Sequence, residues 1–258
     1  MKDEIAESNR QLQEAWKLYA RFSPEGEAID RVNLTFANAK QPWWLMNLCA
    51  LRTSITDQAD LVRRAQEALE YFSVQANPWV LTGSEDWFGP NANLALSTVG
   101  LVHKTDAVGM VAEQLLPPVR SFPDVELRRI SDEQTRRALA DLNADSYEVP
   151  REWARLAVGS PALWAENLFG TVAYINQEPA SGAFALPIND VLYVAWVATA
   201  KAHRRKGLAE MVMRESLAAA KKATGLDRTV LHATADGHPV YLRMGYRDVV
   251  RFPIYGPA

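Results

Sequence analysis

The sequence predicts an α/β fold, in which helices and a mixed sheet form a layered sandwich. Segments with the periodicity of amphipathic helices alternate along the chain with short apolar runs typical of buried strands. Hydrophobic residues make up 48% of the 258 residues and charged residues 23%. A chain of this length and composition can bury a sizeable core without a disulfide or a metal ion.

The first half opens with a helix and continues with strands. Helical periodicity predicts helices over residues 4–21 and 57–73, and short apolar runs between and after them predict strands. The expected strands are 32–36, 43–51 and 79–82, followed by a short helix that ends near Gly100 and by one or two strands within 102–115.

A proline-rich segment divides the chain. Pro117, Pro118 and Pro123 cannot continue a helix or lie inside a central strand. We therefore expect a semi-rigid linker at 117–123, between a first domain at residues 1–116 and a second domain at residues 124–258.

The second half begins again with an expected strand at 125–130. Ser131 and Gln134 fit a capping box at the start of a helix that runs to residue 143. A near-continuous apolar run at 191–199 predicts a buried strand. The other expected elements are a helix from Pro150, a hairpin over 171–186, an amphipathic helix at 208–222, a strand at 229–232, a short helix at 239–244 and an extended segment at 247–255.

Charge and cysteine content exclude several classes of protein. The 28 basic and 31 acidic residues give a net charge of −3, without the basic surplus of a nucleic-acid binder. Cys49 is the only cysteine, which excludes an intramolecular disulfide and a cysteine-based zinc site and favours a buried, inert thiol. The start of the chain lacks the apolar core of a secretory signal, and no stretch approaches ~18 apolar residues. We expect a cytoplasmic monomer or homodimer without a membrane span.

A basic loop with a glycine joins the expected strand at 191–199 to the helix at 208–222. The first turn of a helix has backbone N–H groups without intrahelical partners and carries partial positive charge. Gly207 lets a ligand come close to the backbone, and the small Ala209 keeps that approach open. Three basic side chains add charge at the rim, namely Arg204, Arg205 and Lys206. The loop therefore suits a phosphate-bearing ligand, although a solvated basic loop that only caps the helix gives the same pattern.

Two motifs carry a resemblance to a known family. Arg204-x-x-Gly207-x-Ala209, directly after a buried strand, resembles the acetyl-CoA-binding motif Gln/Arg-x-x-Gly-x-Gly/Ala of the GNAT acetyltransferase superfamily. Farther along, Tyr241-x-x-x-Gly245 followed by a tyrosine resembles the family's Leu-Tyr-x-x-x-Gly-Phe signature. The resemblance covers the second half of the chain. It implies a mostly antiparallel central sheet flanked by helices, acetyl-CoA as the acyl donor and no metal.

The resemblance also implies which residues bind acetyl-CoA. The strand before the loop would hydrogen-bond the pantetheine arm through its backbone at Val197, Ala198 and Thr199. The diphosphate would lie on the backbone amides of Arg205, Lys206, Gly207, Leu208 and Ala209, assisted by Arg204. Thr234 stands where the family often has an asparagine, so it is a weaker candidate for a cofactor contact.

Tyr241 matches the tyrosine that in many members of the family lies near the CoA sulfur and acts as general acid. When an amine attacks the thioester, the departing thiolate benefits from a proton. A phenol with an ordinary pKa of about 10 stays protonated at neutral pH and can supply it. The alternative is an ordinary core aromatic on a short helix.

The sequence assigns no general base. Some members of the family carry a glutamate at the position of Tyr193, but no acidic residue lies within 191–199. His232 and Asp236 are the nearest titratable residues, and a histidine at a strand end is more often structural. Lys201 is a further departure, because the family often has proline there.

The first half repeats the order of elements of the second. If Gly100 corresponds to Gly245, Leu96 corresponds to Tyr241, and the loop at 52–58 has no glycine. We therefore predict a degenerate GNAT-like domain, without diphosphate cradle or acid, that shapes the substrate cleft. The alternative is that any α/β fold gives a similar order. Six tryptophans are candidates either for an aromatic wall beside the acceptor or for the core, namely Trp43, Trp44, Trp79, Trp87, Trp153 and Trp164.

These observations predict an N-acetyltransferase that transfers the acetyl group of acetyl-CoA directly to a primary amine of a small acceptor. The alternative is a non-catalytic acyl-CoA-binding regulator, which the lack of acidic residues on the key strand favours. Nucleic-acid binding through the basic loop is disfavoured by the overall acidity. The acceptor stays open among small amines, amino acids, aminoglycoside-like compounds and protein N-termini.

Overall fold

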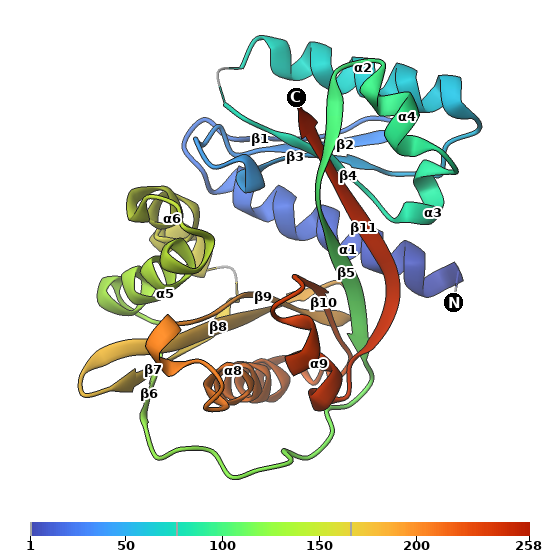
Figure 1. Cartoon of the computed structure of the whole chain (residues 1–258). Coiled ribbons are helices and arrows are strands. Elements are labelled where there is room, and N and C mark those ends of the chain that lie inside the picture. Colours follow the sequence, from blue (N-terminus) through green and yellow to red (C-terminus); the bar gives the residue numbers. More distant parts are fainter. Residues whose placement is uncertain (1, 76, 166) are drawn as a thin grey trace. The chain divides into compact units, whose positions relative to one another are not determined.

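The computed structural model describes residues 2–75, 77–165 and 167–258 (Figure 1). They form two compact units. The N-terminal unit comprises the residues up to Gly109 together with Val249–Ala258, and the C-terminal unit comprises Met110–Asp248.

The chain passes from one unit to the other within two long strands, β5 (Leu101–Ala112) and β11 (Arg247–Pro257). The sequence instead places the division at the prolines of 117–123, a segment without helix or strand that belongs to the C-terminal unit. The borders differ because the last strand returns to the N-terminal unit, where Ile254 pairs with Thr82 of β4 (Val80–Thr82).

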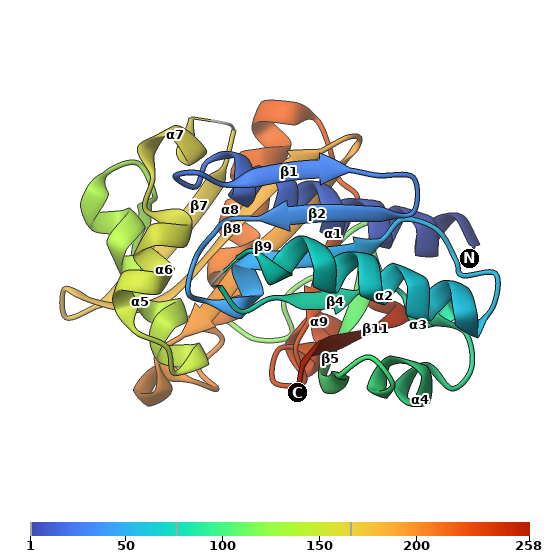
Figure 2. The same ribbon diagram turned by 90° about the horizontal axis from the view of Figure 1, so that it is seen from above.

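The N-terminal unit is a sheet with helices on both faces. Its strands follow the order β1-β2-β3-β4-β11-β5, in which the β3–β4 pair is parallel. Figure 1 shows α1 and α2 on opposite faces of this sheet, and Figure 2 looks onto the face that α2 covers. The elements before β4 are α1 (Lys2–Arg21), β1 (Glu27–Asp30), β2 (Leu34–Asn38), a 3-10 turn η1 (Trp44–Met46), β3 (Asn47–Leu51) and α2 (Gln58–Ser73), and those after it are α3 (Glu85–Phe88) and α4 (Ala92–Ser97).

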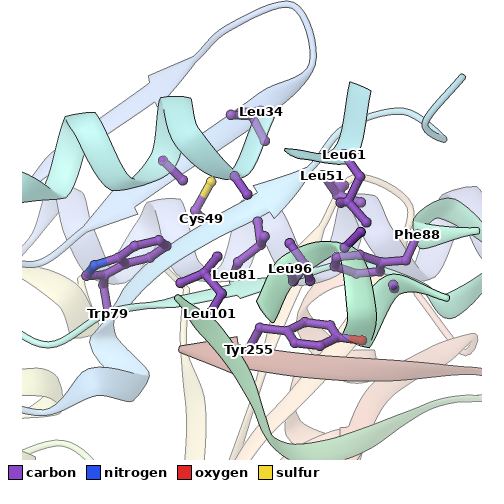
Figure 3. Close-up of a cluster of buried hydrophobic side chains, with 14 of the residues drawn as sticks. Leu34, Cys49, Leu51, Leu61, Trp79, Leu81, Phe88, Leu96, Leu101 and Tyr255 are labelled. Carbon is purple, nitrogen blue, oxygen red and sulfur yellow. The ribbon is translucent and has the colours of Figure 1, made fainter. Parts of the chain in front are cut away.

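Two apolar clusters hold the N-terminal unit together, one on each face of the sheet. Strand side chains alternate between them because successive residues point to opposite faces. In β3, Leu48 and Ala50 join Leu12 of α1, whereas Cys49 and Leu51 face α2 and α4 (Figure 3). The buried thiol predicted for Cys49 is thus confirmed.

Two of the tryptophans considered for an acceptor wall belong to this core. Trp43 is 1% exposed and Trp79 is 6% exposed. Trp79 stacks on Phe72, with 4.5 Å between ring centroids and 8° between ring planes. The core interpretation therefore holds for both residues.

The C-terminal unit is a mostly antiparallel sheet with helices on both faces, as predicted. Its strands follow the order β5-β10-β9-β8-β7-β6, and of the pairs from β6 to β10 only β9–β10 is parallel. Helices α5 and α8 both contact β7, β8 and β9, and Figure 1 shows them on opposite sides of these strands. The elements are β6 (Glu126–Arg129), α5 (Glu133–Tyr147), α6 (Arg151–Val158), α7 (Pro161–Trp164), β7 (Phe169–Ile175), β8 (Glu178–Ile188), β9 (Val191–Thr199), a 3-10 turn η2 (Lys201–His203), α8 (Leu208–Thr224), β10 (Thr229–Ala233) and α9 (His238–Met244).

The capping box predicted from Ser131 and Gln134 is wrong by one residue. Helix α5 begins at Glu133, and the Asp132 carboxylate accepts a hydrogen bond from the Thr135 N–H at 2.8 Å. The Thr135 hydroxyl closes the box. Ser131 and Asp132 are both good N-cap residues. The carboxylate of Asp132 is stabilised additionally by the partial positive charge at the helix start.

Of the helices that the structure describes, none has the length and apolarity that a bilayer crossing requires.

Candidate active site

Strands β9 and β10 run side by side only at their beginnings. Leu192 pairs with Thr229 and Tyr193 with Val230, and no later pair joins the two strands among the described residues. Strand β9 nevertheless continues to Thr199, paired on its other edge with β8. Beyond Tyr193 the edge of β9 that faces β10 is therefore not paired with that strand in the described part of the chain, an arrangement that suits an extended ligand.

A bulge in β9 marks the point of divergence. Trp196 has a φ of 58°, and the register with β8 shifts between Gly182 and Phe184. The bulged carbonyl of Trp196 accepts a hydrogen bond from Nδ2 of Asn143, a buried residue of α5, at 3.1 Å. The packing of α5 thus stabilises a backbone conformation that a bulky residue rarely adopts. Val197, Ala198 and Thr199, the predicted pantetheine contacts, follow directly after this bulge.

The loop between β9 and α8 leaves the start of α8 open. Arg205 and Gly207 have φ values of 63° and 86°, and Gly207 is the N-cap of the helix. No side chain accepts a hydrogen bond at this cap. The first amides of a 17-residue helix therefore point out of the helix without a side-chain partner, which is the arrangement that binds phosphate groups.

The corresponding helix of the N-terminal unit shows the contrast. The carboxylate of Asp57 accepts the Asp60 N–H at 2.8 Å, and the carboxylate of Asp60 accepts the Thr56 N–H at 3.1 Å. Two negative charges thus already occupy the start of α2. A diphosphate would have to displace both carboxylates from these amides.

We therefore predict that each chain binds one molecule of CoA, at the start of α8. Isothermal titration of the purified protein is expected to give a stoichiometry of one. A stoichiometry of two would contradict the assignment of α2 as a filled helix start, and the variant Gly207→Glu would then retain one of the two sites.

The basic side chains of the loop lie at the rim of this helix start. Arg204 donates from Nε to the Thr199 carbonyl at 3.3 Å, which ties the loop to the end of β9. Its Nη1 lies 4.0 Å from a carboxylate oxygen of the exposed Asp236. Lys206 lies 3.4 Å from Nδ1 of His203. The structure thus places Arg204, Arg205 and Lys206 beside the predicted diphosphate position, where their charges favour an anion.

Tyr241 lies in α9, 8% exposed. Its ring folds back onto the turn before the helix, where a Cβ atom on Gly237 would lie 3.0 Å from the Tyr241 hydroxyl. Burial, and to a smaller extent the nearby hydroxyls of Tyr147 and Tyr246, raise the pKa of Tyr241 well above its ordinary value. The phenol therefore stays protonated at neutral pH.

Tyr147, the last residue of α5, is a neighbour of Tyr241 that the sequence analysis did not find. It is 42% exposed, and its hydroxyl is near enough to that of Tyr241 to affect the pKa of that residue. No local pattern marks this position, because α5 and α9 lie far apart in the chain.

Tyr193 and His232 contact each other where β9 and β10 diverge. The Tyr193 hydroxyl lies 3.0 Å from Nδ1 of His232. Burial lowers the pKa of His232 to about 3, so the imidazole is neutral at physiological pH and a weak base. These properties favour a structural role for His232 over that of a general base.

Thr234 is placed at the turn that starts α9. Its carbonyl accepts the Gly237 and His238 N–H groups at 3.1 and 3.0 Å, and its hydroxyl accepts the Gly237 N–H at 3.4 Å. These contacts give Thr234 a structural role in the turn before α9. Its contact with a cofactor stays a prediction.

Residues 128–246 match the family model described as "Acetyltransferase (GNAT) family". This segment holds the diverging strands, the open helix start and Tyr241. It belongs to the GNAT acetyltransferase family. No curated protein matches the chain significantly.

Solved structures of GNAT proteins resemble most of the chain. A GCN5-related N-acetyltransferase from Kribbella flavida has 19% identity and a TM-score of 0.70, with 97% of this chain and 95% of that one covered. One from Sphaerobacter thermophilus has 13% identity and a TM-score of 0.61, covering 86% and 75%. A tandem GNAT protein from the clavulanic acid biosynthesis pathway has 12% identity and a TM-score of 0.55, covering 88% and 79%. At these identities the likeness shows the fold.

Proposed function

We propose that the protein is an N-acetyltransferase that uses acetyl-CoA to acetylate a primary amine. The observation that carries this proposal is the open start of α8, with Arg205 and Gly207 in left-handed conformation, after a strand β9 that diverges from β10, in a GNAT domain. A thioester with a diphosphate-bearing carrier fits both features at once. The N-terminal unit is then a degenerate GNAT-like domain without a donor site of its own.

In this proposal each part of the donor has its own contact. The backbone at Val197, Ala198 and Thr199 binds the amide groups of the pantetheine arm. The diphosphate accepts hydrogen bonds from the backbone amides at the helix start, and Arg204 adds a charge-assisted contact. The amides involved are those of Arg205, Lys206, Gly207, Leu208 and Ala209.

The reaction proceeds by direct attack. The amine lone pair forms a bond to the thioester carbon, and the carbon–sulfur bond then breaks with its electron pair left on sulfur. The Tyr241 hydroxyl donates its proton to that thiolate. The acetylated amine loses its extra proton to water, and the Tyr241 phenolate takes up one proton from water, so that the phenol is restored and no net charge is left on the protein.

Ligand-dependent unfolding tests the acetyl-CoA site. At a hundredfold excess over Kd, a ligand adds about 2.7 kcal/mol to the free energy of unfolding, a rise in Tm of roughly 5–10 °C. We expect this rise for the wild type and its loss in the variant Arg204→Glu, Gly207→Glu. No rise for the wild type at millimolar acetyl-CoA would overturn the proposal.

A matched control separates charge at the site from backbone strain. Gly225 ends α8 with a φ of 78°, and a Cβ atom at this position would meet nothing beyond its chain neighbours within 4 Å. The variant Gly225→Glu therefore carries the same strain at the other end of the helix, without a clash. It is expected to keep the Tm rise with acetyl-CoA.

A non-catalytic acyl-CoA-binding regulator is the second candidate. The neutral His232 and the absence of acidic residues on β9 favour it. Thiol release in the presence of a panel of primary amines distinguishes the two. Binding without any release would support the regulator.

A further inference from the structure

The residue before the proline-rich segment, Leu116, is anchored on α8 and α9. The Leu116 N–H donates to the Met244 carbonyl at 2.8 Å, and the Leu116 carbonyl accepts from Nη2 of Arg214 at 2.6 Å. A Cβ atom on Gly245 would lie 2.8 Å from Cγ of Leu116. The segment therefore starts from a fixed point at the end of α9 and the side of α8.

Four residues later, Arg120 reaches the start of α8. Its Nη1 lies 3.4 Å from the Arg205 carbonyl and donates to it. A Cβ atom on Gly207 would lie 3.3 Å from Nε of Arg120 and 3.5 Å from its Nη2. The guanidinium thus lies over the backbone of the glycine that caps the helix.

Arg120 joins a group of cations with little compensating charge. Within the described parts of the chain, no carboxylate lies within 4.0 Å of the charged groups of Arg120, Arg205 or Lys206, and Asp236 reaches only Arg204. Like charges gathered in this way repel one another, and an anion bound among them removes the repulsion. This charge imbalance indicates an anionic ligand independently of the helix start.

We infer that Arg120 binds the diphosphate of CoA and makes the proline-rich segment part of the donor site. This inference rests on the proposed function. The planar guanidinium presents a fork of N–H donors that fits two phosphate oxygens. On ligand binding its long bond to the neutral Arg205 carbonyl is exchanged for bonds to charged phosphate oxygens, which are shorter and stronger.

Titration calorimetry of the full chain with CoA and with dephospho-CoA, which lacks the 3′-phosphate, tests this inference. We expect Arg120→Gln to weaken both ligands equally, by about tenfold. The matched control is Arg129→Gln, which removes an exposed arginine from the edge strand β6 and is expected to leave both affinities unchanged.

The outcomes are distinct. If the affinities are unchanged in Arg120→Gln, the role of Arg120 is overturned. Binding of CoA by the wild type would in that case still support the donor site. A loss confined to CoA would place the guanidinium on the 3′-phosphate and overturn the assignment to the diphosphate. If the wild type binds neither ligand, the proposed function and this inference both fail.

Discussion

Tyr241→Phe is expected to lower kcat for acetyl transfer by roughly 10²–10⁴-fold, the usual contribution of a general acid. The substitution removes only the hydroxyl, and the ring keeps its edge-to-face contact with Tyr246 at 6.0 Å between centroids. The KM for acetyl-CoA should change little, because the proposed contacts to the diphosphate do not involve the phenol. Initial-rate kinetics of thiol release measure both parameters.

Tyr246→Phe is the matched control, since it removes a second buried phenol next to the first.

Wild-type kcat is expected to show no decline from Tyr241 ionisation between pH 7 and 10, because burial raises the pKa of this group. A general acid must be protonated to act. A raised pKa of Tyr241 therefore shifts the fall of kcat at alkaline pH to higher pH. Equal rates for Tyr241→Phe and the wild type would contradict the acid role.

Asp60→Asn is expected to lower the free energy of unfolding by about 3 kcal/mol. The Asp60 carboxylate lies 2.7 Å from Nη2 of Arg64, whose side chain is 3% exposed. Without that carboxylate the guanidinium keeps its bonds to the Thr53 and Ser54 carbonyls but loses its counter-charge. Urea unfolding measures the change. Arg63→Gln, which removes an exposed partner of the same carboxylate, should cost far less.

The effect of Asp60 depends on pH in a defined direction. Burial raises the pKa of Asp60, but hydrogen bonds from Arg64, the Thr56 N–H and Arg63 outweigh it and lower the pKa to about 2. An unfolded aspartate has a pKa of about 3.9. The stabilisation is therefore full above pH ~4 and is lost as the pH falls toward 2. A difference between wild type and Asp60→Asn that stays constant over this range would contradict the ion pair.

The sequence predicted those features of the structure that depend on residues close together in the chain. The turn at Gly207 and the start of α8 are set by neighbouring residues, so a short motif could locate them. Strand β1 was missed because Glu27 and Asp30 interrupt any apolar alternation in a partly exposed edge strand. The apolar run at 43–51 was predicted as one strand, but its first part is the turn η1, since apolar residues alone do not separate short helices from strands.

The parts of the site that escaped prediction depend on contacts between distant residues. Tyr147 approaches Tyr241 across 94 positions of sequence, and Arg120 reaches Gly207 across 87. The pairing of β11 with β4 also joins distant residues. The apolar side chains of β11 would suit either sheet portion of this protein, so they do not indicate the partner strand. Periodicity and motifs carry no information on such pairs.

The return of β11 has a consequence for how the protein is made. Val250, Phe252 and Tyr255 belong to the two apolar clusters of the N-terminal unit, yet they follow the C-terminal unit in the sequence. Domains of a nascent chain usually fold in the order of their synthesis. Here the N-terminal unit lacks part of its core until the whole C-terminal unit has been synthesised, so the nascent chain exposes apolar surface for longer than two independent domains would.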